Sequence, residues 1–235
     1  MLYICITFAI IVPYLICSIN PAIVVTKIKS GKDIRSLGSG NPGLTNTLRT
    51  QGKGAAIAVL LFDVLKGVIS IFFIMLFLWL FMPEIDESNT SFPLNDMFYY
   101  RCMWLGALAA VLGHCYPVFY KFKGGKAVLV TVATGLVINW LAALIALVLF
   151  ILIVLVTKYV SVGSIISAVA YPIWVLIVED YVRIPVWNGR FHGLGSIGFI
   201  FSSIITIILI FKHKENIKRL MNGTEKKLVS KNPHS

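Results

Sequence analysis

Apolar runs long enough to cross a membrane constrain this chain more than any other feature of its sequence. A crossing takes about 20 apolar residues, and such runs follow one another along the whole chain. They lie at Leu2–Val25, Gly54–Met82, Met97–Phe119, Ala127–Thr157, Ser161–Val178 and Gly193–Phe211. With 58% hydrophobic and 13% charged residues, the chain also departs from the composition of soluble domains. We therefore predict a single polytopic all-α membrane domain over residues 1–235, with a basic cytoplasmic tail at 212–235.

The number of crossings depends on the run 127–157, which is 31 residues long and exceeds one span. A turn at Asn139-Trp140 would divide it into two crossings, whereas a single strongly tilted helix also fits the length. Two crossings give seven transmembrane helices with the N-terminus outside and the C-terminus inside. Seventeen of the 21 Lys and Arg residues then lie in inside segments, as the positive-inside rule requires. We therefore predict seven helices.

The formal net charge of +11 does not indicate nucleic acid here, because the cations lie in loops between apolar runs. The outer loop Pro83–Asp96 is acidic. The first run has two breaks, at Pro13 and at Asn20-Pro21, and it lacks the basic start and the cleavage site of a signal peptide. We expect it to be a retained helix.

The loop after the first run contains a glycine-rich segment, Gly38 to Arg49, with a G-x-G-x-x-G spacing. A dinucleotide fingerprint needs a preceding strand, and here a membrane helix precedes it. Glycines let backbone N–H groups face one anion, and the guanidinium of Arg49 matches phosphate geometry. The alternative is a flexible capped turn, but Arg49 and the neighbouring helix start favour anion binding. The side chains that could add donors are Ser39, Asn41, Thr45 and Asn46.

A second basic loop, Lys121 to Lys126, places Gly124 and Gly125 directly before Lys126. It lacks the spacing of a phosphate-binding Walker A loop. It could simply set membrane topology, but the paired glycines favour close approach of the backbone to a ligand.

Charged side chains also occur inside the second run, where Asp63 and Lys66 are three residues apart on one helical face. Charges at this depth are costly unless they are paired or face a polar cavity. The pair either braces the bundle or lines the site from below. His114 lies at the inner end of the third run, where a lone histidine is usually structural and the alternative is a direct part in the chemistry.

The tail begins with a basic segment in which His213 and Asn216 lie three residues apart and Glu215 lies between them. Ordinary membrane anchoring needs only the lysines. Ser161 and Ser164 form a further inner turn. All these segments lie on one side of the membrane, which favours an anion site there. The histidines are scattered and no metal cluster is expected; the His-x4-Asp dyad of soluble-type glycerolipid acyltransferases is also absent.

Taken in order, five motifs resemble the bacterial acyl-phosphate:glycerol-3-phosphate acyltransferase family. These are GSGNPGLTNTLR, DVLKG, GHCYPVFYKFKGGKA, YVSVGS and KHKENIKRLMNGTE. The resemblance implies a seven-helix bundle in the bacterial cell membrane, with its active site facing the cytoplasm. It also implies transfer of a fatty acyl group from acyl phosphate to the 1-hydroxyl of sn-glycerol 3-phosphate, giving lysophosphatidate and phosphate. No cofactor is expected, and the functional partner would be the enzyme that makes acyl phosphate.

The resemblance also implies roles for individual residues. Glycerol 3-phosphate would be held by Ser39, Arg49, Lys126, His213 and Asn216. The phosphate of the donor would be held by Gly40, Asn41, Thr45, Asn46 and Ser164. Supporting residues would be Asp63, Lys66, His114, Gly124, Gly125 and Glu215. The chain departs from the family pattern at Pro42, Leu44 and Ala127; Pro42 removes one backbone N–H, and Ala127 stands where glycine is usual.

An acyl phosphate is already activated, so the enzyme mainly has to align the substrates and neutralise their charges. We expect a phosphate oxygen of the donor to take the hydroxyl proton; the rival mechanism uses His213 as general base. A transporter for a phosphorylated metabolite would use similar loops, but it predicts polar groups on both sides of the membrane. A scaffold subunit would leave the glycine-rich loops unexplained.

Overall fold

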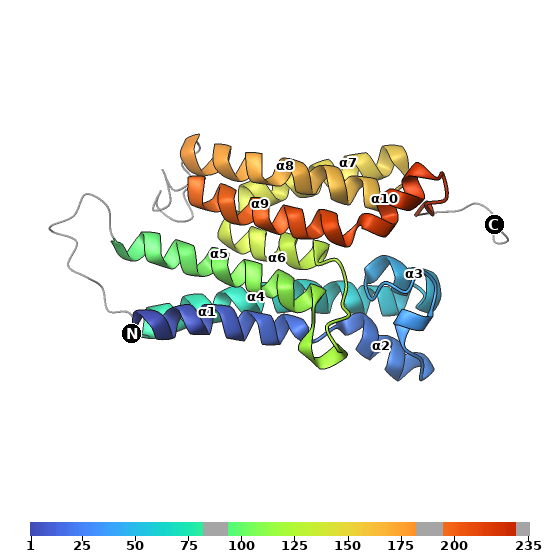
Figure 1. Cartoon of the computed structure of the whole chain (residues 1–235), viewed down its shortest axis with the longest axis horizontal. Coiled ribbons are helices and arrows are strands. Elements are labelled where there is room, and N and C mark those ends of the chain that lie inside the picture. Colours follow the sequence, from blue (N-terminus) through green and yellow to red (C-terminus); the bar gives the residue numbers. More distant parts are fainter. Residues whose placement is uncertain (82–93, 182–194, 229–235) are drawn as a thin grey trace.

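The computed structural model describes residues 1–81, 94–181 and 195–228, and within these ranges every regular element is a helix. The α-helices are α1 (Leu2–Ser18), α2 (Pro21–Ser30), α3 (Leu44–Gln51), α4 (Lys53–Phe81), α5 (Leu94–Cys115), α6 (Val128–Ile138), α7 (Trp140–Thr157), α8 (Val160–Tyr181), α9 (Gly195–Lys212) and α10 (Lys214–Met221). The long helices run side by side in one bundle (Figure 1). The short helices α2, α3 and α10 gather at the end opposite the N-terminus, on the right of the view.

The first apolar run is broken at one of the two predicted places. Pro13 lies inside α1 without ending it, which membrane helices tolerate. The chain breaks instead at Asn20-Pro21, where Asn20 Oδ1 accepts a hydrogen bond from the N–H of Ile23 at 3.2 Å and caps α2. The amide of Asn20 donates to the carbonyl of Pro42 at 3.2 Å, so this break also anchors the glycine-rich loop.

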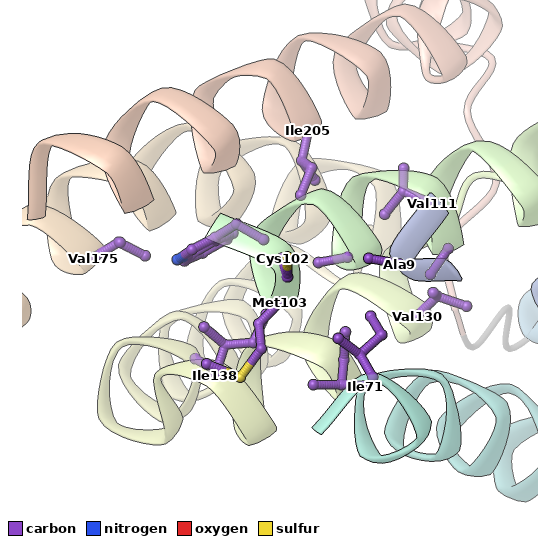
Figure 2. Packing of buried hydrophobic residues seen from close by; sticks show 14 of the residues in the cluster. Ala9, Ile71, Cys102, Met103, Val111, Val130, Ile138, Val175 and Ile205 are labelled. Carbon is purple, nitrogen blue, oxygen red and sulfur yellow. The ribbon is translucent and has the colours of Figure 1, made fainter. Parts of the chain in front are cut away.

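Helix α5 runs through the middle of the bundle (Figure 2), and its span is the most buried among the candidate spans of the described ranges. Cys102, Met103 and Val111 on α5 pack against residues of other helices, among them Ile71 and Ile205. Gly113 allows α1 to approach closely, because a Cβ there would lie 2.3 Å from the carbonyl oxygen of Tyr14. Small residues at such crossings maximise packing where lipid supplies no hydrophobic driving force.

The run 127–157 is divided at Asn139, as predicted. Asn139 ends α6 and caps α7 by accepting a hydrogen bond from the N–H of Ala142 at 3.1 Å. Its amide donates to the buried carboxyl of Glu179 at 3.0 Å, which ties the turn to α8. The 11 residues of α6 rise only about 16 Å and cannot cross a hydrocarbon core of about 30 Å alone. Asn139 therefore separates a short apolar helix from a longer one, and the number of crossings that this run makes stays a prediction.

Five helices in the described ranges are long and apolar enough to span a membrane, or six if α9 and α10 form one bent span. The chain bends by 55° between α9 and α10. The predicted count of seven spans and the orientation of the termini stay predictions. The acidic loop Pro83–Asp96 falls mostly outside the described residues, and so do Arg183 and Arg190 in the loop before α9.

Candidate functional site

A cavity of about 230 Å³ opens where the short helices meet the bundle. Its polar end is formed by the glycine-rich loop with α3, by the start of α6, by the start of α8 and by α10 with the following turn. Its other end runs between α6, α7 and α8 and is lined mainly by apolar side chains. Segments that are far apart in the sequence thus converge on one site with a charged end and an apolar arm.

Asn46 holds the glycine-rich loop in place. Its Oδ1 accepts from the N–H of Ser39 at 2.9 Å, and its amide donates to the carbonyl of Leu37 at 2.9 Å. Gly38 has a φ of +57°, and a Cβ there would lie 2.3 Å from Asn46 Oδ1, so only glycine fits. The buried amide of Asn46 is therefore largely occupied by the loop itself, and its contribution to an anion site is positional.

The start of α3 presents the free N–H groups that an anion needs. Gly43 precedes the helix without a capping side chain, and Leu44 and Thr45 line the cavity. The unpaired N–H groups of a first turn and the helix dipole both favour a negative group at this position. Ser39 and Asn41 border the same space. The predicted anion site is therefore sterically and electrostatically possible.

Arg49 lies on the same helix and also lines the cavity. In this structure its guanidinium donates to the backbone carbonyls of Lys226 and Lys227 at 3.0 and 3.4 Å. Carbonyl oxygens are weaker acceptors for a guanidinium than phosphate oxygens, because a carbonyl carries no net negative charge. Arg49 is thus available to a phosphate that enters the cavity, and it meanwhile holds the tail over the opening.

A chain of polar contacts joins α6, α10 and α8 across the polar end. Lys126 donates to Asn216 Oδ1, and the amide of Asn216 donates to Glu225 at 2.6 Å. Glu225 also accepts from Ser161 at 2.9 Å and pairs with Arg219 at 2.7 Å. Burial alone would raise the pKa of Glu225, but these hydrogen bonds outweigh it and hold the pKa below its usual value. Glu225 is therefore an anion that organises the cations around it.

Burial lowers the pKa of Lys126 to about 8; Glu225 opposes the shift, and the charges of Arg219 and Arg49 add to it. Burial and the neighbouring cations disfavour the charged form of Lys126, so a dianion that enters the cavity would stabilise that form. Four cationic side chains line the cavity, at Arg49, Lys126, Arg219 and Lys226. Two carboxylates of the described residues line it as well: Glu225, which pairs with Arg219, and Asp63, which pairs with Lys66.

His213 lies in the bend between α9 and α10 and is buried. Its Nδ1 lies 2.7 Å from the carbonyl oxygen of Leu209. A carbonyl can only accept, so Nδ1 carries the hydrogen, and the neutral ring then has its lone pair on Nε2. His213 can therefore accept one hydrogen bond from a hydroxyl in the cavity.

The charged pair inside α4 is part of a buried triad. Lys66 Nζ lies 2.8 Å from Asp63 Oδ1 and 3.0 Å from His114 Nδ1, and it donates to the carbonyl of Ile19 at 2.9 Å. These contacts join α4 to α5 and to the break between α1 and α2. Asp63 and His114 border the cavity, whereas Lys66 does not. The contacts join three segments of the bundle beside the cavity, and the bracing role and the role in the site both stay predictions.

The two glycines before Lys126 pack against the end of α5. A Cβ on Gly124 would lie 2.1 Å from the carbonyl oxygen of His114, and one on Gly125 would lie 2.3 Å from His114 Nε2. The close approach expected toward a ligand is made toward His114, and it orients the lysine that follows. Ala127 adopts a φ of +59°, so this departure from the family pattern keeps a backbone conformation that glycine adopts more easily.

All five residues predicted to hold glycerol 3-phosphate line the cavity, and so do Asn41, Thr45, Asn46 and Ser164. Gly40, Gly124 and Gly125 are not among the residues that line the cavity, and Glu215 is exposed on the first turn of α10. Sequence reasoning missed Glu225, Arg219 and Lys226. The sequence feature that could have pointed to Glu225 is the glycine at the end of the last motif, in Gly223-Thr224-Glu225. Gly223 has a φ of +67° and turns the chain back toward the cavity.

Comparison with known proteins agrees with this geometry. A family model described as glycerol-3-phosphate acyltransferase matches residues 7–223. A glycerol-3-phosphate acyltransferase of Staphylococcus aureus (strain NCTC 8325 / PS 47) is 36% identical over 215 residues, which is 92% of this chain and 94% of the relative. Another, of Thermoanaerobacter pseudethanolicus, is 37% identical over 221 residues, which is 94% of each chain.

Two solved structures share the fold. Both are of PlsY (YgiH), an integral membrane glycerol 3-phosphate acyltransferase. The glycerol 3-phosphate form has a TM-score of 0.74 at 29% identity and covers 94% of each chain. The lysophosphatidic acid form has a TM-score of 0.71 at 28% identity with the same coverage.

Proposed function

Because the chain belongs to the glycerol-3-phosphate acyltransferase family, we propose that its cavity binds sn-glycerol 3-phosphate together with an acyl phosphate and transfers the acyl group to the 1-hydroxyl. The observation that carries the proposal is the pairing of a cation-rich polar end with an apolar arm in one cavity. Two phosphorylated substrates need several cations, and a fatty acyl chain needs an apolar arm. The products are 1-acyl-sn-glycerol 3-phosphate and inorganic phosphate.

The glycerol 3-phosphate is held by Ser39, Arg49, Lys126, His213 and Asn216 in this proposal. Arg49 and Lys126 neutralise its phosphate, and the neutral groups orient the glycerol hydroxyls. The loop that carries Asn41 and Thr45, together with the first turn of α3, takes the phosphate of the donor. This assignment places the two anions side by side at the polar end and directs the acyl chain into the arm.

The reaction needs no protein nucleophile, because phosphate is a good leaving group. The 1-hydroxyl attacks the carbonyl carbon of the donor, a new ester bond forms, and the bond between the carbonyl carbon and the phosphate oxygen breaks. The hydroxyl proton passes to a phosphate oxygen of the donor. The cations stabilise the charge that develops on the leaving phosphate. His213 accepts a hydrogen bond from a glycerol hydroxyl and orients it.

The excess of Lys and Arg in the loops at the cavity end supports an orientation with the site on the cytoplasmic face of the bacterial cell membrane. Soluble glycerol 3-phosphate reaches the site from that side. An enzyme that makes acyl phosphate must supply the donor.

The test compares donors and uses a matched pair of arginine variants. Purified protein is incubated with labelled glycerol 3-phosphate and either palmitoyl phosphate or palmitoyl coenzyme A, and labelled lysophosphatidate is followed. We expect product with palmitoyl phosphate alone. Arg49→Ala should lose about 1.5–3 kcal/mol of charged hydrogen bonding to phosphate, or roughly 10- to 100-fold in kcat/KM. Arg101→Ala, which removes an exposed arginine near the start of α5, should keep the wild-type rate.

Product from palmitoyl coenzyme A alone would refute the donor assignment. No product from either donor with folded protein would refute acyl transfer altogether. Turnover at saturating substrate separates the two proton routes, because His213→Asn keeps most of the turnover if the donor takes the proton and loses it if His213 is the base.

A further inference from the structure

The apolar arm of the cavity follows one face of α8. Ser161 and Ser164 lie at the polar end of this face, and Ser167, Ala168 and Tyr171 continue it at helical spacing into the bundle. Opposite them lie side chains of α6 and α7, which meet at Asn139. The arm therefore deepens toward the turn between α6 and α7.

Three helices close the deep end of the arm at one point. A Cβ on Gly135 of α6 would lie 2.6 Å from the hydroxyl of Tyr171 and 3.2 Å from Cβ of Ala143 on α7. Tyr171 is 5% exposed, and its ring lies 6.5 Å from that of the buried Trp104. The phenol is thus supported from behind and cannot move away from the arm without disturbing the core.

Hydroxyl groups also line the arm. The hydroxyls of Thr131, Ser167 and Tyr171 are buried, and none of them has a hydrogen-bond partner in the structure. All three residues line the cavity. The deep end therefore resists an acyl chain by its shape, because the ring of Tyr171 fills the space where the three helices meet.

We propose that Tyr171 determines the length of acyl chain that the enzyme accepts, by closing the apolar arm where α6, α7 and α8 meet. The inference rests on the proposed function, because it assumes that the acyl chain of the donor enters the arm. Seven residues separate Ser164 from Tyr171, or about 10 Å along the helix. A carbon–carbon bond is about 1.5 Å long, and an extended alkyl chain advances roughly 1.3 Å per bond, so this depth takes roughly eight methylenes. Longer chains have to leave the arm sideways.

The experiment measures the ratio of kcat/KM for stearoyl phosphate to that for decanoyl phosphate in each variant. Tyr171→Ala opens the floor, and we expect the ratio to rise about tenfold or more, since each methylene that gains a site contributes severalfold. Gly135→Ala pushes the phenol into the arm, and we expect the ratio to fall. Tyr171→Phe is the matched control, because it keeps the ring and should leave the ratio within about twofold of wild type.

Because a ratio is measured, partial loss of folded protein cancels from both terms. An unchanged ratio in Tyr171→Ala would overturn the assignment, and so would a change in Tyr171→Phe as large as that in Tyr171→Ala, because the ring would then not be what limits the chain. Wild-type protein that uses neither acyl phosphate would overturn the proposed function and this inference with it. Normal wild-type rates with an unchanged ratio would overturn only the role of Tyr171.

Discussion

Replacing Lys66 by methionine tests whether the buried triad braces the bundle. The Lys66→Met variant removes one ion pair and two further contacts from a site where Asp63 is 2% exposed and Lys66 is 8% exposed. Removing one partner of a buried pair costs about 3–5 kcal/mol, because the remaining charge has no partner. At about 2–4 °C per kcal/mol for a chain of this size, the melting temperature should fall by roughly 6–20 °C.

The assay is thermal unfolding of the purified protein in detergent. A double-mutant cycle compares the single variants Asp63→Asn and Lys66→Met with the double variant Asp63→Asn/Lys66→Met. The second change removes the stranded carboxylate, so the double variant should be more stable than the sum of the two single effects by at least about 0.5 kcal/mol. Lys53→Met, at an exposed lysine at the start of the same helix, is the matched control and should change little. A Lys66→Met protein that melts within a few degrees of wild type, or strict additivity in the cycle, would refute the bracing role.

Three further predictions concern the polar end. Lys126 has a pKa near 8 and is charged only below it, so kcat/KM for glycerol 3-phosphate should fall as pH rises through 8; Lys126→Arg should remove that fall, while Lys123→Arg should keep it. Ala127→Gly relieves a positive φ and should raise the melting temperature by the equivalent of about 1 kcal/mol, measured in the same unfolding assay. Glu225→Gln leaves Arg219 without its counter-ion and should raise the KM for glycerol 3-phosphate severalfold, whereas Glu215→Gln, at the exposed carboxylate, should match wild type in the same kinetics.

The sequence predicts the bundle well where one physical signal dominates. Hydropathy places α4 and α8 within three residues of their observed ends. The division at Asn139 follows from the capping preference of asparagine. Pro13 misleads because a proline in a membrane helix breaks the chain only when its neighbours fail to compensate, and that depends on packing which a sequence does not display.

Candidate site residues are predictable as a group but not in their individual tasks. Arg49 and Lys126 are evident because phosphate recognition restricts residue type. The roles of Asn46 and Gly125 are not evident, since each depends on a tertiary contact, with the loop at Ser39 in one case and with His114 in the other. Glu215 and Glu225 look equivalent in the sequence, and only the turn at Gly223 decides which of them faces the cavity.

The bend between α9 and α10 divides the chain into a part that forms the bundle and a part that completes the polar end of the cavity. The apolar helices up to α9 satisfy their own backbone hydrogen bonds and can fold in a bilayer without the residues after Lys212. His213, Asn216, Arg219 and Glu225 all follow that point. A chain shortened after Lys212 would therefore keep the helices of the apolar arm but lack much of the charged end. The polar end of the cavity is complete only when α10 and the turn that follows it pack across the bundle.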